Sequence, residues 1–309
     1  MSTPLSRLVA ALQGVIVGQD GVIADVVTAF LARGHVLLEG VPGVAKTLLA
    51  RSLASSLGLD FTRVQFTPDL MPSDILGTNV FRQDTAEFRL VKGPLFTECL
   101  LADEINRTPP KTQAALLEAM EERQITIDGE THPLPPHFFV VATQNPLELE
   151  GTYPLPEAQL DRFLMRVRVG YPDERAELAM LTAFHGRGGK APNVTQVLNP
   201  EELATLQTQA SQIRCDDSIL QYVAKIVRET RQHSRVRLGA SPRSAQALLA
   251  AAKARAALGG ETFVTPDDVK AVVNSVLNHR LLLKAEAEVE GVTTDEVLRQ
   301  TLDRVQVPR

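Results

Sequence analysis

The sequence predicts an α/β domain with a parallel sheet in a three-layer αβα arrangement, followed by an all-helical lid domain. Short apolar runs alternate with helical patterns in the first half of the chain, as in parallel sheets covered by helices. After Pro172, only helical patterns remain. A length of 309 residues also suits two domains. We therefore expect a core domain over residues 1–172 and a helical lid domain over 173–309.

Five apolar runs of strand length are the expected strands of the sheet. A Gly/Pro loop follows the first run and leads into a helical pattern over residues 47–57. Such an order of strand, loop and helix is the repeating unit of a parallel sheet. The five predicted strands are residues 35–39, 61–66, 97–102, 138–143 and 165–169.

Two stretches between the predicted strands are expected to be insertions. Residues 67–96 contain several prolines and a short alternating segment, which predicts an inserted loop or hairpin. Residues 124–136 predict a second hairpin, because the dipeptide Asp128-Gly129 accepts the positive φ of a tight turn. A long loop inside a compact domain usually carries function, so both insertions are candidate contacts for another protein.

The composition excludes several classes of protein. Lys and Arg number 32 against 37 Asp and Glu, and this balance argues against coating nucleic acid or an anionic membrane. Cys99 and Cys215 are too few for a disulfide framework, and the six histidines follow no metal-binding spacing. No apolar run reaches the roughly 18 residues of a membrane span. Because the first residues also lack the pattern of a signal peptide, we expect a cytoplasmic protein.

The segment after the first predicted strand has the pattern of a phosphate-binding loop. The general pattern is G-x-x-x-x-G-K-[ST], and only Ala45 departs from it, at the place of the second glycine. Backbone N–H groups at the start of the helix would face the phosphates of ATP. Lys46 would reach the β- and γ-phosphates, and Thr47 would take one position on Mg²⁺. The alternative is an ordinary glycine turn before a helix with an exposed lysine. The segment comprises Gly40, Val41, Pro42, Gly43, Val44, Ala45, Lys46 and Thr47, with Leu48 in the helix that follows.

Two adjacent carboxylates follow the third predicted strand. Asp103 and Glu104 come directly after the apolar run, and burying charge there is costly without a partner. Magnesium and water would supply a reason: Asp103 would hold the metal and Glu104 would deprotonate the attacking water. Neighbouring residues of a strand point to opposite faces, so we expect Glu104 to act where the chain has already turned. The alternative is a pair of solvated carboxylates that cap the following turn.

Taken together, these motifs resemble those of the MoxR family of AAA+ ATPases. Beside the phosphate loop, the resemblance rests on segments LLADEINR, ATQNP, LPEAQLDRF and GASPR in this order along the chain. They begin at Leu100, Ala142, Leu155 and Gly239 and cover nearly the whole length. Magnesium-chelatase ATPase subunits are similar and are the nearest alternative.

The resemblance implies roles for further residues. Asn145 is expected to position the attacking water, and Arg162 to act as an arginine finger that stabilises charge in the transition state. The sequence leaves open whether Arg162 serves its own site or that of a neighbouring subunit. Arg243 lies in the first turn of a lid helix, where a cation needs a compensating anion, and an ATP phosphate would supply it. Val17 and Gly18 resemble the adenine-side loop, and Arg107 is a weaker candidate for a contact between subunits.

The same resemblance implies that the chain is an ATPase that hydrolyses Mg²⁺-bound ATP to ADP and phosphate. It implies a homo-oligomeric ring, with a hexamer as the expected size, that remodels or activates a protein client. A partner with a von Willebrand factor A domain is also implied. A nucleotide-gated binding module and a nucleic-acid-directed motor remain as alternatives, and the intact carboxylate pair and the acidic net charge respectively weigh against them.

Overall fold

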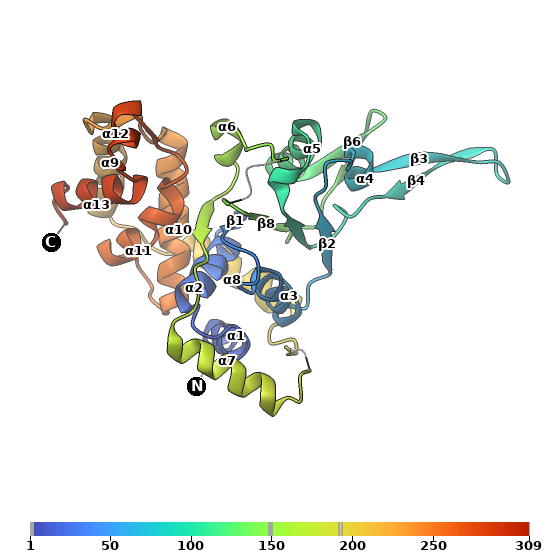
Figure 1. Ribbon diagram of the computed structural model, residues 1–309, viewed down its shortest axis with the longest axis horizontal. Coiled ribbons are helices and arrows are strands. Elements are labelled where there is room, and N and C mark those ends of the chain that lie inside the picture. Colours follow the sequence, from blue (N-terminus) through green and yellow to red (C-terminus); the bar gives the residue numbers. More distant parts are fainter. Residues whose placement is uncertain (1–2, 148–150, 191, 193, 309) are drawn as a thin grey trace.

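The computed structural model describes residues 3–147, 151–190, 192 and 194–308. Its centre is a five-stranded sheet in the order β2-β5-β8-β1-β9, and every neighbouring pair of strands runs parallel (Figure 1). The five apolar runs thus form one parallel sheet, as predicted. The strands are β1 (Val36–Glu39), β2 (Phe61–Gln65), β5 (Cys99–Asp103), β8 (Phe139–Gln144) and β9 (Met165–Arg168).

Alternation along the strands gives the sheet two buried faces. Val36 and Leu38 of β1 join one apolar core, and Leu37 between them joins the other. The first core also contains the helices α1 (Pro4–Gln13), α2 (Asp20–Leu31) and α3 (Lys46–Leu57), and the second contains α5 (Pro110–Glu122). These helices supply the outer layers of the predicted αβα arrangement.

Both insertions are hairpins. The first contains α4 (Pro72–Leu76) and an antiparallel pair of strands, β3 (Gly77–Arg82) and β4 (Glu87–Lys92). Figure 1 shows this pair projecting far from the body of the molecule. The second pairs β6 (Gln124–Ile127) with β7 (Glu130–Pro133), and Asp128 and Gly129 take positive φ at the turn, as predicted.

The C-terminal part is helical apart from one short pair of strands. The helix α7 (Glu174–Gly186) leads out of the core, and α10 (Pro242–Gly259) contacts both α2 and α8 (Pro200–Gln212) (Figure 1). The expectation of an all-helical lid was incomplete, because β10 (Val236–Leu238) pairs with β11 (Leu282–Leu283). Strands this short show no periodicity in a sequence. The remaining helices are α6 (Glu157–Leu160), α9 (Asp217–Gln232), α11 (Pro266–Leu277), α12 (Ala285–Val289), α13 (Thr294–Arg304) and a 3₁₀ turn, η1 (Ile105–Arg107).

Among the described residues, no helix has both the length and the apolar character that a membrane crossing requires.

Candidate functional site

The phosphate-loop segment lies at the carboxyl end of β1 and ends in the first turn of α3. Gly40 is required there, because a Cβ at this position would lie 2.3 Å from the carbonyl oxygen of Val169. Gly43 and Ala45 both take left-handed backbone conformations, with φ of +86° and +62°. Ala45 thus takes a backbone conformation that costs glycine little energy. Its methyl group makes the same conformation less favourable, and this is the energetic cost of the departure from the motif.

Lys46 lies over this loop. Its Nζ donates a hydrogen bond to the carbonyl oxygen of Gly40. Partial burial lowers the pKa of the Lys46 ammonium, while Asp103 and Glu104 act in the opposite direction. The side chain is therefore a partly desolvated cation whose hydrogen-bond partner is neutral, and an anion placed in the loop would bind it more strongly.

Asp103 and Glu104 lie at the same edge of the sheet, two strands away from β1. Asp103 is buried, and it accepts hydrogen bonds from Thr143 Oγ1 at 2.6 Å and from Arg63 Nη2 at 2.7 Å. Glu104 has φ of +58°, so the chain has left the strand at this residue, as expected. Its Oε2 accepts hydrogen bonds from Gln65 Nε2 at 2.5 Å and from Arg107 Nη1 at 3.0 Å.

Sequence reasoning missed Arg63, Gln65 and Thr143 as parts of this site. Arg63 and Gln65 lie on β2, which pairs with β5 in the register Gln65 to Asp103. The polar side chains of Arg63 and Gln65, at alternate positions of this strand, were a signal. However, only the strand order places them beside the carboxylates, so the sequence alone could not assign them.

Asn145 follows β8, which lies between β1 and β5 in the sheet. It is buried, and its Oδ1 accepts a hydrogen bond from the backbone N–H of Leu147 at 3.2 Å. Because carboxyl ends of parallel strands meet at one edge of a sheet, Asn145 lies between the phosphate loop and the carboxylates. The structure therefore brings these three predicted elements together.

A cavity of about 320 Å³ adjoins the phosphate loop on its other side. Its walls come from Val17 and its neighbours, from the loop and α3, and from α7. Gly18 has φ of +74°, and a Cβ there would lie 2.3 Å from the Cβ of Ala176, so the turn packs closely on α7. A largely apolar cavity next to a phosphate loop suits a planar base. Val17 and Leu48, which the sequence assigned to nucleotide binding, both line this cavity.

The structure does not bring Arg162 and Arg243 to this edge. Arg162 precedes β9, which runs parallel to β1 with Met165 opposite Val36, so Arg162 lies at the amino ends of the strands. Arg162 Nε donates to Glu121 Oε2 at 2.8 Å, and Arg243 Nη1 donates to Glu121 Oε1 at 2.9 Å. Glu121 is thus the anion that compensates Arg243 within this chain. Both arginines hydrogen-bond to Glu121, and this lowers the pKa of its carboxyl group.

The loop before Arg162 is fixed to the lid. Arg280 is almost fully buried, and its Nε donates to Asp161 Oδ1 at 2.6 Å. The same guanidinium donates to the carbonyl oxygen of Phe163 at 2.8 Å. Asp161 therefore pairs with Arg280 of the lid, whereas its neighbour Arg162 pairs with Glu121. Sequence reasoning missed Arg280, since its partner is far away along the chain.

The residues expected to hold Mg²⁺ fit that ion. The described residues contain no group of three or more His, Cys, Asp or Glu arranged to hold a metal. Mg²⁺ does not need such a group, because it keeps several waters and commonly takes one or two protein oxygens together with substrate phosphates. The hydroxyl of Thr47, in the first turn of α3, and the buried carboxylate of Asp103, at the end of β5, are oxygen donors of that type. Both lie at the carboxyl ends of the strands.

Fold and site together define a P-loop ATPase with a C-terminal lid. Sequence models agree: residues 35–165 match the ATPase family associated with various cellular activities (AAA), and residues 228–301 match the AAA lid domain. The chain belongs to the MoxR family of AAA+ ATPases.

Similar proteins cover nearly the full length of this chain. Chaperone MoxR1 of Mycobacterium tuberculosis is 43% identical over 99% of this chain and 82% of its own. The uncharacterised protein YeaC of Bacillus subtilis is 47% identical over 98% of this chain and 95% of its own. The crystal structure of a candidate ATPase from Cytophaga hutchinsonii superposes with a TM-score of 0.91 at 39% identity, covering 99% of this chain and 95% of that one.

Proposed function

We propose that this ATPase works as a homo-oligomeric ring in which neighbouring subunits complete each other's sites. One observation carries the proposal: the phosphate loop and the pair Arg162 and Arg243 lie at opposite edges of one sheet. A residue at the amino ends of the strands is separated by the length of β1, roughly 13 Å at 3.3 Å per residue, from the loop at their carboxyl ends. The arginines are therefore proposed to serve the ATP of a neighbour.

Repetition of such a contact makes a ring. The interface joins two different faces of the chain, and a heterologous contact must close on itself or grow into a filament. The family resemblance favours closure, with six subunits as the proposed number. In this arrangement the two guanidiniums would stabilise charge that develops on the terminal phosphate of the neighbouring ATP.

The residues of the phosphate-loop edge divide the chemistry of hydrolysis among them. Lys46 would exchange the Gly40 carbonyl for phosphate oxygens, and Thr47 and Asp103 would hold Mg²⁺, which supplies positive charge next to the phosphates when bound. Glu104 would accept the proton of the attacking water, and Asn145 would orient that water. Val17, Gly18 and Leu48 would enclose the base.

Two substitutions test this assignment. Lys46→Ala should abolish ATP binding, because it removes the cation of the loop. Glu104→Gln should preserve ATP binding while steady-state phosphate release falls by about 10²–10⁴. Isothermal titration and a phosphate-release assay on the same preparations separate the two effects. Undiminished binding by Lys46→Ala would disprove the site, and undiminished turnover by Glu104→Gln would disprove the base.

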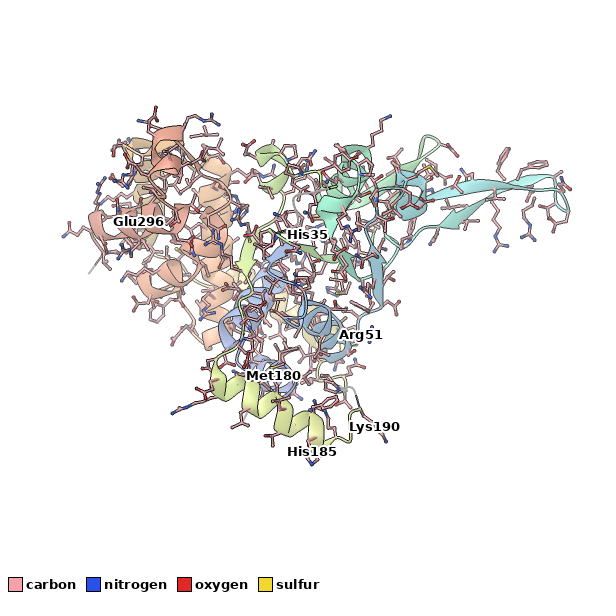
Figure 2. All side chains as sticks on the ribbon, viewed as in Figure 1. His35, Arg51, Met180, His185, Lys190 and Glu296 are labelled. Carbon is pink, nitrogen blue, oxygen red and sulfur yellow. The ribbon has the colours of Figure 1, made fainter. Side chains whose placement is uncertain are left out.

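The strands β3 and β4 are the proposed contact with a protein client. Phe81 and Phe88 form an exposed cross-strand pair, with ring centroids 5.3 Å apart, on a hairpin that projects from the molecule (Figure 2). The other insertion is less available, since Ile125 and Ile127 are buried in the second core. Replacing Phe81 and Phe88 by serine should leave ATPase activity intact and reduce capture of unfolded protein. Unchanged capture would exclude this surface.

The remaining parts of the proposal rest on resemblance. Because MoxR1 is named a chaperone, we infer a chaperone-like role that remodels or activates a client. From the family resemblance of the motifs, we further infer that the chain works in the cytoplasm alongside a protein with a von Willebrand factor A domain. Co-purification of such a protein with the Glu104→Gln variant would support this partnership. Salt-sensitive stimulation of the ATPase by DNA would instead favour the nucleic-acid motor.

A further inference from the structure

The helix α7 leaves an apolar ridge without a partner. Of its 13 residues, only Ala176 is buried. Leu178, Leu181 and Phe184 are 66%, 66% and 57% exposed, and they recur at the spacing of one helix face. Glu174 extends this face into the first turn of α7. Figure 2 shows α7 at the outer border of the molecule, with His185 at that border. We call these four residues the α7 ridge.

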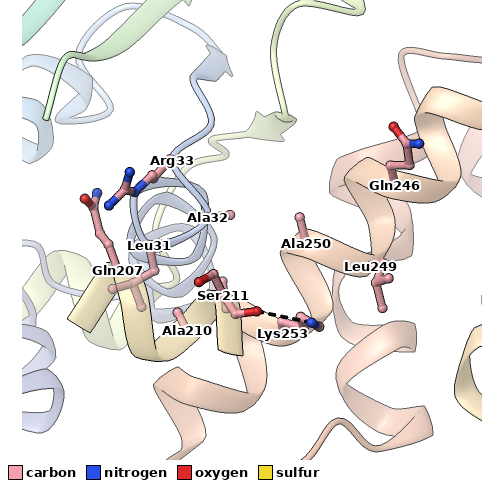
Figure 3. Close-up of a pocket in the computed structure, with 11 residues that line it drawn as sticks. Leu31, Ala32, Arg33, Gln207, Ala210, Ser211, Gln246, Leu249, Ala250 and Lys253 are labelled. Carbon is pink, nitrogen blue, oxygen red and sulfur yellow. Dashed lines mark hydrogen bonds between the residues drawn. The ribbon is translucent and has the colours of Figure 1, made fainter. Parts of the chain in front are cut away.

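A groove of suitable character lies elsewhere on the molecule, between α2, α8 and α10. It has a volume of about 270 Å³. Its floor is made of small and apolar side chains, among them Leu31, Ala210 and Ala250. Figure 3 shows Ala32 and Ala250 on facing elements across the opening, with Lys253 at its end. We call this the α10 groove.

The two surfaces have opposite charge. The α10 groove carries Arg33 and Lys253 among its lining residues and no acidic residue. Lys253 donates a hydrogen bond to the carbonyl oxygen of Ser211 at 3.1 Å, which is a neutral partner. The first turn of α7 is acidic, with Glu174 and Glu177. An acidic, apolar helix face and a basic, apolar groove are the two halves of a helix-in-groove contact.

Both surfaces adjoin the proposed contact between subunits. The α10 groove continues the line of Arg243 along one face of α10, since Gln246, Ala250 and Lys253 follow it at helical spacing. The α7 ridge adjoins the cavity beside the phosphate loop, because Leu181 of the ridge also lines that cavity. When Arg243 of one subunit approaches the phosphates of the next, the α10 groove of the first subunit therefore approaches the α7 ridge of the second. This inference rests on the proposed ring.

We propose that the α7 ridge of each subunit docks in the α10 groove of the neighbouring copy. The contact covers the exposed leucines and phenylalanine, and it places the basic groove against the acidic first turn. It also adds a wall to the nucleotide cavity from outside the subunit. Two alternatives compete with this contact. In the first, α7 closes over the nucleotide cavity of its own subunit. In the second, an unrelated protein occupies the α10 groove.

Engineered disulfides test the proposal in the full-length chain. In a Cys215→Ser background, Leu178→Cys and Ala250→Cys are combined with Glu104→Gln, so that bound ATP persists with Mg²⁺. Under mild oxidation, the double-cysteine protein should form a ladder of cross-linked multimers. Each single-cysteine protein is the matched control and should remain uncross-linked, because the ridge meets the groove and never another ridge.

Charge reversal gives an independent measurement. Lys253→Glu should raise the protein concentration needed for ATP-dependent assembly by about tenfold in sedimentation velocity, and adding Glu174→Lys should restore most of it. Neither residue lines the nucleotide cavity. Multimers that assemble normally without cross-links, together with charge reversals that have no effect, would overturn the docking and leave the ring intact. Absence of any ATP-dependent assembly by the Glu104→Gln protein would instead overturn the ring itself.

Discussion

Glu121 holds two arginines that come from different parts of the chain. Arg162 belongs to the core and Arg243 to the lid helix α10, and each binds one oxygen of the same carboxylate. In the proposed ring, the terminal phosphate of a neighbour's ATP competes with this carboxylate for both guanidiniums. Because Arg243 is 58% exposed, its ion pair is weak enough for a phosphate to displace.

Neutralising Glu121 should therefore favour ATP. Glu121→Gln keeps the shape and removes the competing charge, so we expect the KM for ATP to fall by about two- to tenfold while kcat stays within about twofold. Steady-state ATPase kinetics measure both. Glu122→Gln removes the same charge one residue further on and should leave KM unchanged. A fall in kcat at constant KM would contradict competition and indicate that Glu121 orients the arginines.

His35 makes the stability of the core depend on pH. It is buried before β1, where its Nδ1 accepts from the N–H of Val140 at 3.0 Å and its Nε2 contacts the carbonyl oxygen of Met120 at 3.2 Å. Burial, reinforced by the charge of Arg123, lowers the pKa of His35 from 6.5 to about 3. The unfolded chain therefore binds a proton below pH 6.5 that the folded chain refuses, and stability falls as pH falls from 6.5 towards 3.

A variant without His35 should lose part of this dependence. Each pH unit below 6.5 costs about 1.4 kcal/mol for this group, so it accounts for about 2 kcal/mol between pH 6.5 and 5. His35→Gln should be less stable than the parent at pH 7 but should lose about 2 kcal/mol less on acidification to pH 5. Urea unfolding at the two pH values gives the difference. Equal losses in both proteins would show that His35 is protonated in the folded state.

Local elements of this fold follow from the sequence more readily than their arrangement. The runs around Leu37, Leu100 and Val140 are apolar on both faces, and this predicts central strands of a parallel sheet. Their order in the sheet depends on contacts between distant residues, so the partners of Asp103 on β2 could not be found from spacing. The turn at Asp128 and Gly129 was predictable because its conformation depends on two residues alone.

The turn from β1 to α3 shows how an element constrains the site. A Cβ on Gly40 would meet a backbone oxygen of residue 169, which cannot move aside as a side chain can. Gly40→Ala should therefore displace the loop and weaken ATP binding by more than about tenfold, since misplaced groups lose much of their interaction. Gly21→Ala is the control: Gly21 lies in α2, where an added Cβ would meet no neighbouring atom within 4 Å, and the substitution should add about 0.5–1 kcal/mol of stability. Nucleotide titration and thermal unfolding measure both effects.

The direction of β9 determines at which end of the strands Arg162 lies. The motif around this residue was recognisable in the sequence, whereas the choice between its own site and a neighbour's was not. A parallel strand that follows Arg162 places it at the edge opposite the phosphate loop, and this geometry exists only once the chain has folded. The buried pair of Asp161 and Arg280 then fixes that edge to the lid. In the proposed ring, each subunit thus has a phosphate-loop face and an arginine face, and neither face alone holds a complete site.

Mixing two inactive variants tests this division between subunits. Glu104→Gln lacks the base and keeps the arginine, and Arg162→Ala keeps the base and lacks the arginine. If sites form between subunits, an Arg162→Ala subunit regains a complete site beside a Glu104→Gln neighbour, and random equimolar rings contain about a quarter of such interfaces. Phosphate release by the mixture should therefore rise well above that of either variant alone. It should approach about a quarter of the rate of the unsubstituted enzyme if the interfaces act independently. A mixture that only averages its parents, or full turnover by Arg162→Ala alone, would mean that each chain hydrolyses ATP by itself.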